Sequence, residues 1–333
     1  MGLNICLIGC GSIVNKYHGP SYIKYRETYG DLSLSGCCDI NAEAAKQCAF
    51  KFGFEKYFTV IEDMLATCKP DAVCINVNPG AIAKIVNRVM ELGYPVLMEK
   101  PPGYTYAEAQ SIAETALKTG VSNQVAFNRR FMPIVREYKR YYAESLSPEP
   151  VQSIFCDFYR YERNDNDFFT TAIHGIDLVR FIAGSDYKDV RFSYQEMPQY
   201  GQNVCNIFID GTLKNDAHVQ LRFCPMAGNI IERVTVNLRG HTVFLRAPMT
   251  HSYDLPGNLS HVNGDGEVFY LSGANLPDGT DIFVYSGFYG EIESFFNDIK
   301  SGVRPLNDIN TAMQSVQMME CIAKRDNTYT SHP

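Results

Sequence analysis

Two residues in this sequence have side chains and settings suited to acid–base chemistry, and the first is Lys100. It stands in E-K-P-P-G at 99–103, at the carboxyl end of a predicted strand over Pro95–Glu99. Open α/β sheets place their ligands at that edge. A lysine held between a short strand and a stiff Pro-Pro turn can hydrogen-bond a substrate hydroxyl and help to lower its pKa. The alternative is a solvated lysine leaving a strand.

The second residue is His174, in H-G-I-D at 174–177, on a predicted helix over Phe169–Ala183. Imidazole takes up a proton near neutral pH, so His174 is a candidate general base. Residues three apart share a helix face, and Asp177 can therefore fix the orientation of the ring. The alternative is a core histidine whose hydrogen bonds are satisfied within the protein.

A glycine-rich loop near the start of the chain is typical of dinucleotide binding. Leu3–Ile8 is an apolar run, as in a strand buried on both faces of a parallel sheet. Gly9 permits a tight turn, and Gly11 has no side chain to block a pyrophosphate. Ser12 then opens a helix whose first N–H groups favour an anion. The third position of G-x-G-x-x-G is Val14, so strand and helix pack slightly further apart there; a plain tight turn is the alternative.

An acidic residue follows the second predicted strand, Leu32–Cys38, at Asp39. In a dinucleotide-binding fold this position faces the adenosine ribose, whose hydroxyls donate to a carboxylate. The same carboxylate repels a 2′-phosphate, which favours NAD over NADP. The alternative is an ordinary helix N-cap or turn aspartate.

The order of predicted elements changes after Arg130. Strands alternate with helices before that point, which favours a doubly wound, mostly parallel sheet. Strands dominate after it, which indicates an α+β domain with an open, largely antiparallel sheet. We therefore predict an α/β protein with an NAD-binding domain at 1–125 and a substrate and oligomerisation domain at 126–333.

The composition of Pro256–Gly266, rich in Gly, Asn, His and Ser, predicts a long surface loop.

Composition narrows the class of protein. The chain has 333 residues, a formal net charge of −7 and no basic run, which argues against nucleic acid as a partner. No apolar stretch is long enough to span a membrane, and we expect a cytoplasmic protein. One face of the second sheet needs cover, so a homodimer or homotetramer is expected.

The 11 cysteines include no C-x-x-C pair. Cys6, Cys74 and Cys156 lie in strand-like runs and read as small buried hydrophobic residues. The sequence therefore predicts no disulfide framework and no metal site.

Together the motifs resemble the Gfo/Idh/MocA family over nearly the whole chain. The resemblance rests on G-C-G-S-I-V-N-K-Y-H at 9–18, Asp39, E-K-P-P-G at 99–103, F-N-R-R-F-x-P at 127–133 and H-G-I-D at 174–177. It implies an N-terminal Rossmann domain, a C-terminal domain with an open sheet, a bound nicotinamide cofactor and a sugar or cyclitol substrate. By position, Lys100 is the family's E-K-P lysine, His174 its active-site histidine, and Asn128 lies near the nicotinamide.

Two positions depart from the family pattern. Many family dehydrogenases have an aspartate four residues before the histidine, where this chain has Thr170, while Asp165 and Asp167 look like helix-start residues. The loop after the fourth strand reads Val77-Asn78-Pro79, where the family has T-P-N or similar.

We predict an NAD-dependent oxidoreductase that transfers hydride between nicotinamide and a sugar, cyclitol or related polyol, with Lys100 and His174 as catalytic residues. A glycosidase of the same family that uses bound NAD, and a non-catalytic cofactor or sugar sensor, are the alternatives. The predicted cofactor contacts are Gly9, Gly11, Ser12, Ile13, Asp39, Asn76, Asn78, Glu99, Lys100 and Asn128; the predicted substrate contacts are Lys100, Tyr159, Tyr161, Arg163, Thr170 and His174.

Overall fold

A computed structural model describes residues 2–277 and 279–331. The chain divides into two units: residues up to Phe127 with Phe288–Val316, and Asn128–Gly287 with the residues from Gln317 on. This division differs from the predicted boundary, because a segment far along the chain groups with the N-terminal unit. The reason is aromatic packing: Phe296 of that segment stacks on Tyr22 at 6.0 Å between ring centroids.

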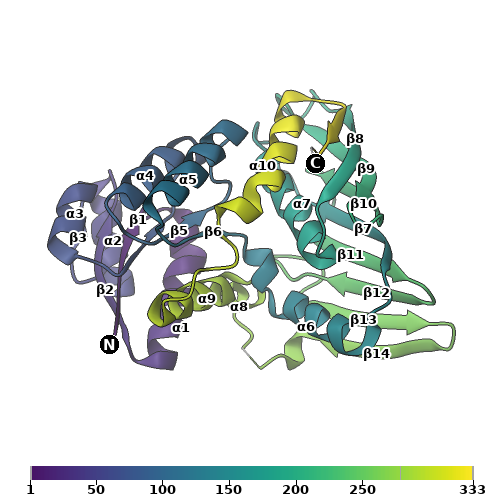
Figure 1. Ribbon diagram of the computed structural model, residues 1–333, viewed down its shortest axis with the longest axis horizontal. Helices are drawn as coiled ribbons and strands as arrows, with labels where there is room; N and C mark the ends of the chain where they lie inside the picture. Colours follow the sequence, from purple (N-terminus) through teal and green to yellow (C-terminus); the bar gives the residue numbers. More distant parts are fainter. Residues whose placement is uncertain (1, 278, 332–333) are drawn as a thin grey trace. The chain divides into compact units, whose positions relative to one another are not determined.

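The first unit contains a six-stranded, all-parallel sheet in the order β3-β2-β1-β4-β5-β6 (Figure 1). The order reverses direction between β1 and β4, which is the switch point of a doubly wound Rossmann sheet, and ligands bind beyond the carboxyl ends of the strands there. The predicted fold class is confirmed. The strands are β1 (Leu3–Ile8), β2 (Leu32–Cys38), β3 (Tyr57–Phe58), β4 (Ala72–Ile75), β5 (Val96–Glu99) and β6 (Asn123–Ala126).

Short polar signals set the helix ends in this unit. Asn41 caps α2 by accepting hydrogen bonds from two backbone N–H groups, and Thr105 and Glu108 form a capping box at the start of α5. The helices are α1 (Gly19–Tyr29), α2 (Ala42–Phe52), α3 (Ile61–Cys68), α4 (Pro79–Glu91), α5 (Tyr106–Thr119) and α9 (Phe288–Ser301).

The first helix begins at Ser12 as predicted and is irregular before Pro20. Its residues Val14–His18 form a π turn, labelled η1, in which the N–H of Gly19 bonds to the carbonyl of Val14, five residues back. Proline has no N–H to continue the ladder. The helix therefore restarts as α1 with Pro20 in its first turn.

The second unit is built on a nine-stranded sheet in the order β14-β13-β12-β11-β7-β10-β9-β8-β15. All pairs are antiparallel except β7 with β10. The strands are β7 (Val151–Tyr159), β8 (Tyr187–Glu196), β9 (Cys205–Leu213), β10 (His218–Cys224), β11 (Ile231–Leu238), β12 (His241–Arg246), β13 (Asn258–Asn263), β14 (Gly266–Ser272) and β15 (Thr328–Thr330).

The predicted loop over Pro256–Gly266 is wrong, because β13 occupies most of it and pairs with β12 and β14. Leu259 and His261 are buried, while Asn258 and Ser260, which alternate with them, are half-buried. The turn-like composition belongs to the outer side of a strand and to the turn after it.

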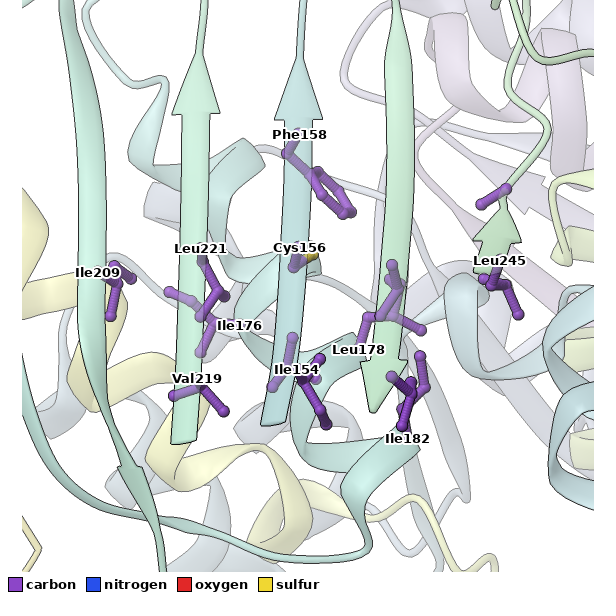
Figure 2. Packing of buried hydrophobic residues seen from close by; sticks show 14 of the residues in the cluster. Ile154, Cys156, Phe158, Ile176, Leu178, Ile182, Ile209, Val219, Leu221 and Leu245 are labelled. Carbon is purple, nitrogen blue, oxygen red and sulfur yellow. The ribbon is translucent and has the colours of Figure 1, made fainter. Parts of the chain in front are cut away.

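Helices cover one face of this sheet. Figure 2 shows Ile154, Cys156 and Phe158 of β7, with residues of β10, packed against Ile176, Leu178 and Ile182 of α7. The helical elements are η2 (Asn128–Phe131), α6 (Pro133–Tyr141), η3 (Tyr142–Leu146), α7 (Phe169–Ala183), η4 (Gly273–Asn275) and α8 (Ile282–Tyr285), and α10 (Ile309–Lys324) runs across the division between the units.

The opposite face of the same sheet carries exposed aromatic side chains. Phe244 of β12 is 38% exposed and Tyr270 of β14 is 56% exposed, while their strand neighbours point toward the helices. None of the helices in the described part of the chain has the length and apolar character needed to cross a membrane.

Candidate active site and cofactor site

The glycine loop after β1 has the room that a pyrophosphate needs. Gly9 has a φ of +89°, and a Cβ on it would lie 2.1 Å from the carbonyl oxygen of Asn76, so only glycine fits. A Cβ on Gly11 would meet nothing within 4 Å. Ser12 and Ile13 follow in the first helical turn. The open space beside Gly11 and the helix start fit an anionic group.

Asp39 lies beside this loop and lines a cavity of about 540 Å³ in the first unit. Its Oδ2 accepts a hydrogen bond from the N–H of Cys10 at 2.8 Å, and its Oδ1 accepts one from the N–H of Asn41 at 2.9 Å. Asn41 is the cap of α2, so Asp39 is not its N-cap; the contact of Asp39 with the N–H two residues further on is that of a turn aspartate, the other form of the alternative. Ile40 and Ile61 add apolar walls to the cavity, which fits a nucleoside.

Two asparagines line the same cavity after β4. The side-chain nitrogen of Asn76 is buried and has no hydrogen-bond partner within residues 2–277 and 279–331, so a donor is available to a ligand oxygen. Asn78 caps α4 by accepting from the N–H of Gly80 at 2.9 Å. The change from T-P-N to Val77-Asn78-Pro79 thus supplies a helix cap with proline at the first helical position.

A buried histidine–carboxylate pair stands behind Lys100 at the end of β5. Nε2 of His18 lies 2.7 Å from Oε1 of Glu99, and Oε2 of Glu99 accepts the backbone N–H of Lys100 at 3.0 Å. Both partners are buried, while the Lys100 side chain is half-buried. Glu99, predicted as a cofactor contact, therefore anchors the strand end that carries Lys100.

In the second unit, His174 is buried on α7 and is held by a guanidinium. Nη1 of Arg129 lies 3.1 Å from Nδ1 and 3.0 Å from Nε2 of the ring. An arginine N–H only donates, so at least one ring nitrogen must be an unprotonated acceptor. The neutral imidazole is therefore the form that this contact favours.

Arg129 is itself part of a buried charge cluster. Its Nε and Nη2 donate to Glu232 at 3.2 and 2.8 Å, and Arg160 donates to the same carboxylate. Burial alone would raise the pKa of Glu232, but the two guanidinium groups outweigh burial and hold that pKa below its usual value. Two cations and one anion leave a net positive charge beside His174, which again disfavours its protonated form.

Asp177, expected to orient His174, is bound by other side chains. Nε and Nη2 of Arg130 donate to its two oxygens at 2.8 and 2.6 Å, and Arg180 lies 3.8 Å away. Asn128, expected near the nicotinamide, donates to the carbonyl of Ser286 at 2.7 Å and accepts from Arg129. Both residues serve to fix η2 and α7 within the second unit.

The predicted substrate contacts are spread over different surfaces of the second unit. Thr170 is buried one helical turn before His174 on α7. Tyr159 lies on the sheet face opposite the helices, where its hydroxyl donates to Asp157 at 3.0 Å. Tyr161 is 57% exposed just beyond β7.

Arg163 donates to both oxygens of Asp165, at 2.5 and 2.9 Å. That contact is the leading cause of the depressed pKa of Asp165, about 2. Asp165 is therefore an ion-pair partner, and α7 starts at Phe169, with Phe168 as an N-cap residue that makes no side-chain cap hydrogen bond. The interpretation of Asp165 as a helix-start residue is wrong.

Four residues of these networks escaped the sequence analysis as site residues: His18, Arg129, Arg160 and Glu232. His18 and Arg129 stand inside quoted motifs, so their positions were visible although their partners were not. Arg160 follows β7 directly, one residue after the predicted contact Tyr159. Glu232 shows no local signal, since it is one acidic residue in an alternating strand.

Residues 3–127 match the model of an oxidoreductase family with an NAD-binding Rossmann fold, GFO_IDH_MocA. The match covers the first unit's sheet, and over these residues the chain is similar to the Gfo/Idh/MocA family. The resemblance drawn from the motifs is confirmed, as are the Rossmann fold and NAD as the family's cofactor.

The curated proteins that the chain is similar to include dehydrogenases. It is 30% identical over 129 residues to D-glucoside 3-dehydrogenase of Escherichia coli, covering 39% of this chain and 36% of that protein. It is 23% identical over 281 residues to the NAD-dependent scyllo-inositol 2-dehydrogenase of Bacillus subtilis, which covers 79% of this chain and 77% of that protein. The chain spans about half, 54%, of a third relative, an uncharacterized oxidoreductase, YrbE, of Bacillus subtilis.

Solved structures share the fold over the full length. A levoglucosan dehydrogenase in complex with NADH and levoglucosan has a TM-score of 0.83 at 18% identity, covering 99% of each chain. An oxidoreductase domain protein from Kribbella flavida has a TM-score of 0.85 at 16% identity, covering 100% of each chain.

Proposed function

We propose that the protein is an NAD-dependent dehydrogenase that transfers hydride between nicotinamide and a sugar, cyclitol or related polyol. The family, its NAD-binding fold and the named relatives support the reaction class. The observation that carries the proposal is the Arg129 contact with His174, because it favours a neutral ring able to accept a proton.

The residues of the first unit would hold the cofactor. The loop from Gly9 to Ile13 would receive the pyrophosphate, Asp39 the adenosine ribose and Asn76 a further oxygen. Bound NAD⁺ would supply the hydride acceptor.

The proposed catalytic residues are Lys100 and His174, and each would act on a substrate hydroxyl. Lys100 donates a hydrogen bond that orients the hydroxyl and stabilises developing alkoxide charge. His174 accepts the hydroxyl proton and becomes imidazolium, a form that the guanidinium of Arg129 destabilises. The proton would therefore pass on to solvent rather than stay on the ring. No carboxylate at position 170 opposes that transfer.

The test is a panel of sugars, inositols and other polyols assayed for NADH formation, alongside calorimetric titration with NAD. Formation of one NADH for each polyol molecule oxidised, with at least one compound of the panel, supports the proposed dehydrogenase activity. Tight NAD binding with no NADH formed across the panel would favour the sensor. Glycoside cleavage without net NADH release would favour the glycosidase.

A further inference from the structure

Three thiols from three different elements meet behind the glycine loop of the first unit. Cys10 lies between the two glycines, Cys37 lies in β2 and Cys48 lies in α2. Their sulfur atoms all lie within 4.8 Å of one another, and the three residues are 3%, 0% and 1% exposed. The sequence predicted no metal site because these cysteines lie far apart in the chain and form no C-x-x-C pair.

The cluster differs from the buried cysteines that only fill space. Cys6, Cys74 and Cys156 are buried in strands, as predicted. Within residues 2–277 and 279–331, Cys10, Cys37 and Cys48 form the only group of three or more potential metal ligands whose donor atoms converge. Convergence of three soft donors on one point is what a thiophilic cation requires.

We propose that Cys10, Cys37 and Cys48 form a binding site for one thiophilic cation of the Zn²⁺ type. Zinc–sulfur bonds of about 2.3 Å place three sulfurs of a tetrahedral site roughly 3.8 Å apart. Small side-chain rotations that draw the sulfurs together by up to about 1 Å reach that geometry. The fourth position is left for water. The thiolate is the form that binds metals, so each thiol that ligates the cation loses its proton to solvent and the affinity rises with pH.

The site would tie together the elements that carry the cofactor-binding residues. The N–H of Cys10 already bonds to Asp39 at the end of β2, and Cys37 and Cys48 lie in that strand and the helix after it. A cation at the cluster therefore stabilises the loop, β2 and α2 as one piece. It binds the folded chain and raises the midpoint of thermal unfolding.

The experiment uses the full chain, reduced and stripped with a chelator that is then removed. Titration with Cd²⁺ alone should produce a sulfur-to-cadmium ultraviolet charge-transfer band that saturates at one equivalent. Zn²⁺, followed by competition with a chromophoric chelator, should give the same stoichiometry. Since losing a contact around a metal ligand costs about 10–100-fold in affinity, losing a ligand, as in Cys48→Ser, should cost at least about 100-fold.

Cys224→Ser is the matched control, because Cys224 is a half-buried cysteine of β10 outside the cluster. This variant should bind Cd²⁺ as the wild type does. Circular dichroism in the presence of chelator tests whether Cys48→Ser is folded. If Cys48→Ser is not folded, Cys10→Ser is used as the cluster variant. Absence of the band in the wild type, or equal affinity of the wild type and the folded cluster variant, would overturn the proposal.

Discussion

The carboxylate of Asp39 combines a structural contact with a proposed cofactor contact. It fixes the glycine loop through the N–H of Cys10 at 2.8 Å and lines the cavity where we place the adenosine. A 2′-phosphate would meet this negative charge, and the ribose hydrogen bonds would be lost.

We therefore predict that the protein binds NAD more tightly than NADP by about 1–3 kcal/mol, roughly 5–150-fold. Asp39→Asn keeps an oxygen that can accept from the N–H of Cys10 and removes the charge, so the difference in binding free energy between NAD and NADP should be smaller in this variant. Calorimetric titration with both dinucleotides measures this difference. Wild-type protein that binds NADP as tightly as NAD would refute the assignment.

A second prediction at the residue scale concerns His174 and pH. Because Arg129 lies 3.0 Å from the ring, the rate of polyol oxidation should rise with deprotonation of a group at or below the free-histidine value of about 6.5. Thr170→Asp places a carboxylate one helical turn before His174, which stabilises imidazolium. The rising limb of the pH–rate profile should move to higher pH in this variant, with Thr170→Asn as the uncharged control. An unmoved limb would show that another group is the titrating base.

At the scale of elements, the buried ion pairs join strands and helices of the second unit. Glu232 of β11 holds Arg129 of η2 and Arg160 beyond β7. Removing one partner of a buried cluster leaves charge uncompensated, which typically costs about 3–5 kcal/mol. Glu232→Gln should lower the free energy of unfolding of this unit by about that amount, as denaturant titration can measure. Glu267→Gln, on the exposed edge strand β14, is the control and should change little.

The same carboxylate gives a direction to the acid dependence of stability. The pKa of Glu232 is lower in the folded chain than its ordinary value of 4.5. Its contribution to stability is therefore complete above that value and is lost as the pH falls through the folded pKa. Unfolding titrations at pH 6 and at successively lower pH should show a smaller loss of stability in Glu232→Gln than in the wild type. Parallel losses in both proteins would contradict this role.

Element boundaries were largely predictable, and the pairing of buried charges was not. The ranges predicted for β1, β2 and α7 match the structure closely, because burial and backbone hydrogen bonding act locally. Arg129 and Glu232 are 103 residues apart, and His18 and Glu99 are 81 apart, so no local pattern connects them. The prediction of a loop over Pro256–Gly266 was wrong because the polar face of β13 has a composition that resembles that of a loop.

At the scale of the whole molecule, the open face of the nine-stranded sheet is the surface on which we predict self-association. It presents Phe244 and Tyr270, and such an aromatic surface is costly to leave in water. Light scattering at micromolar concentration should show a dimer or tetramer. Phe244→Asp with Tyr270→Asp should shift the protein toward monomer, whereas Leu117→Asp, at an 85% exposed position on α5, should not. A wild-type monomer would end this proposal.

The central claim is hydride transfer with His174 and Lys100 acting on the substrate hydroxyl, and the rate of NADH formation tests it most directly. With a polyol substrate from the panel, turnover should be compared among wild type, His174→Ala and Lys100→Ala, with NAD affinity measured in parallel. Each substitution should lower turnover by about 10²–10⁴-fold while NAD binding changes little. Full turnover in His174→Ala would contradict the account and make the histidine a structural residue.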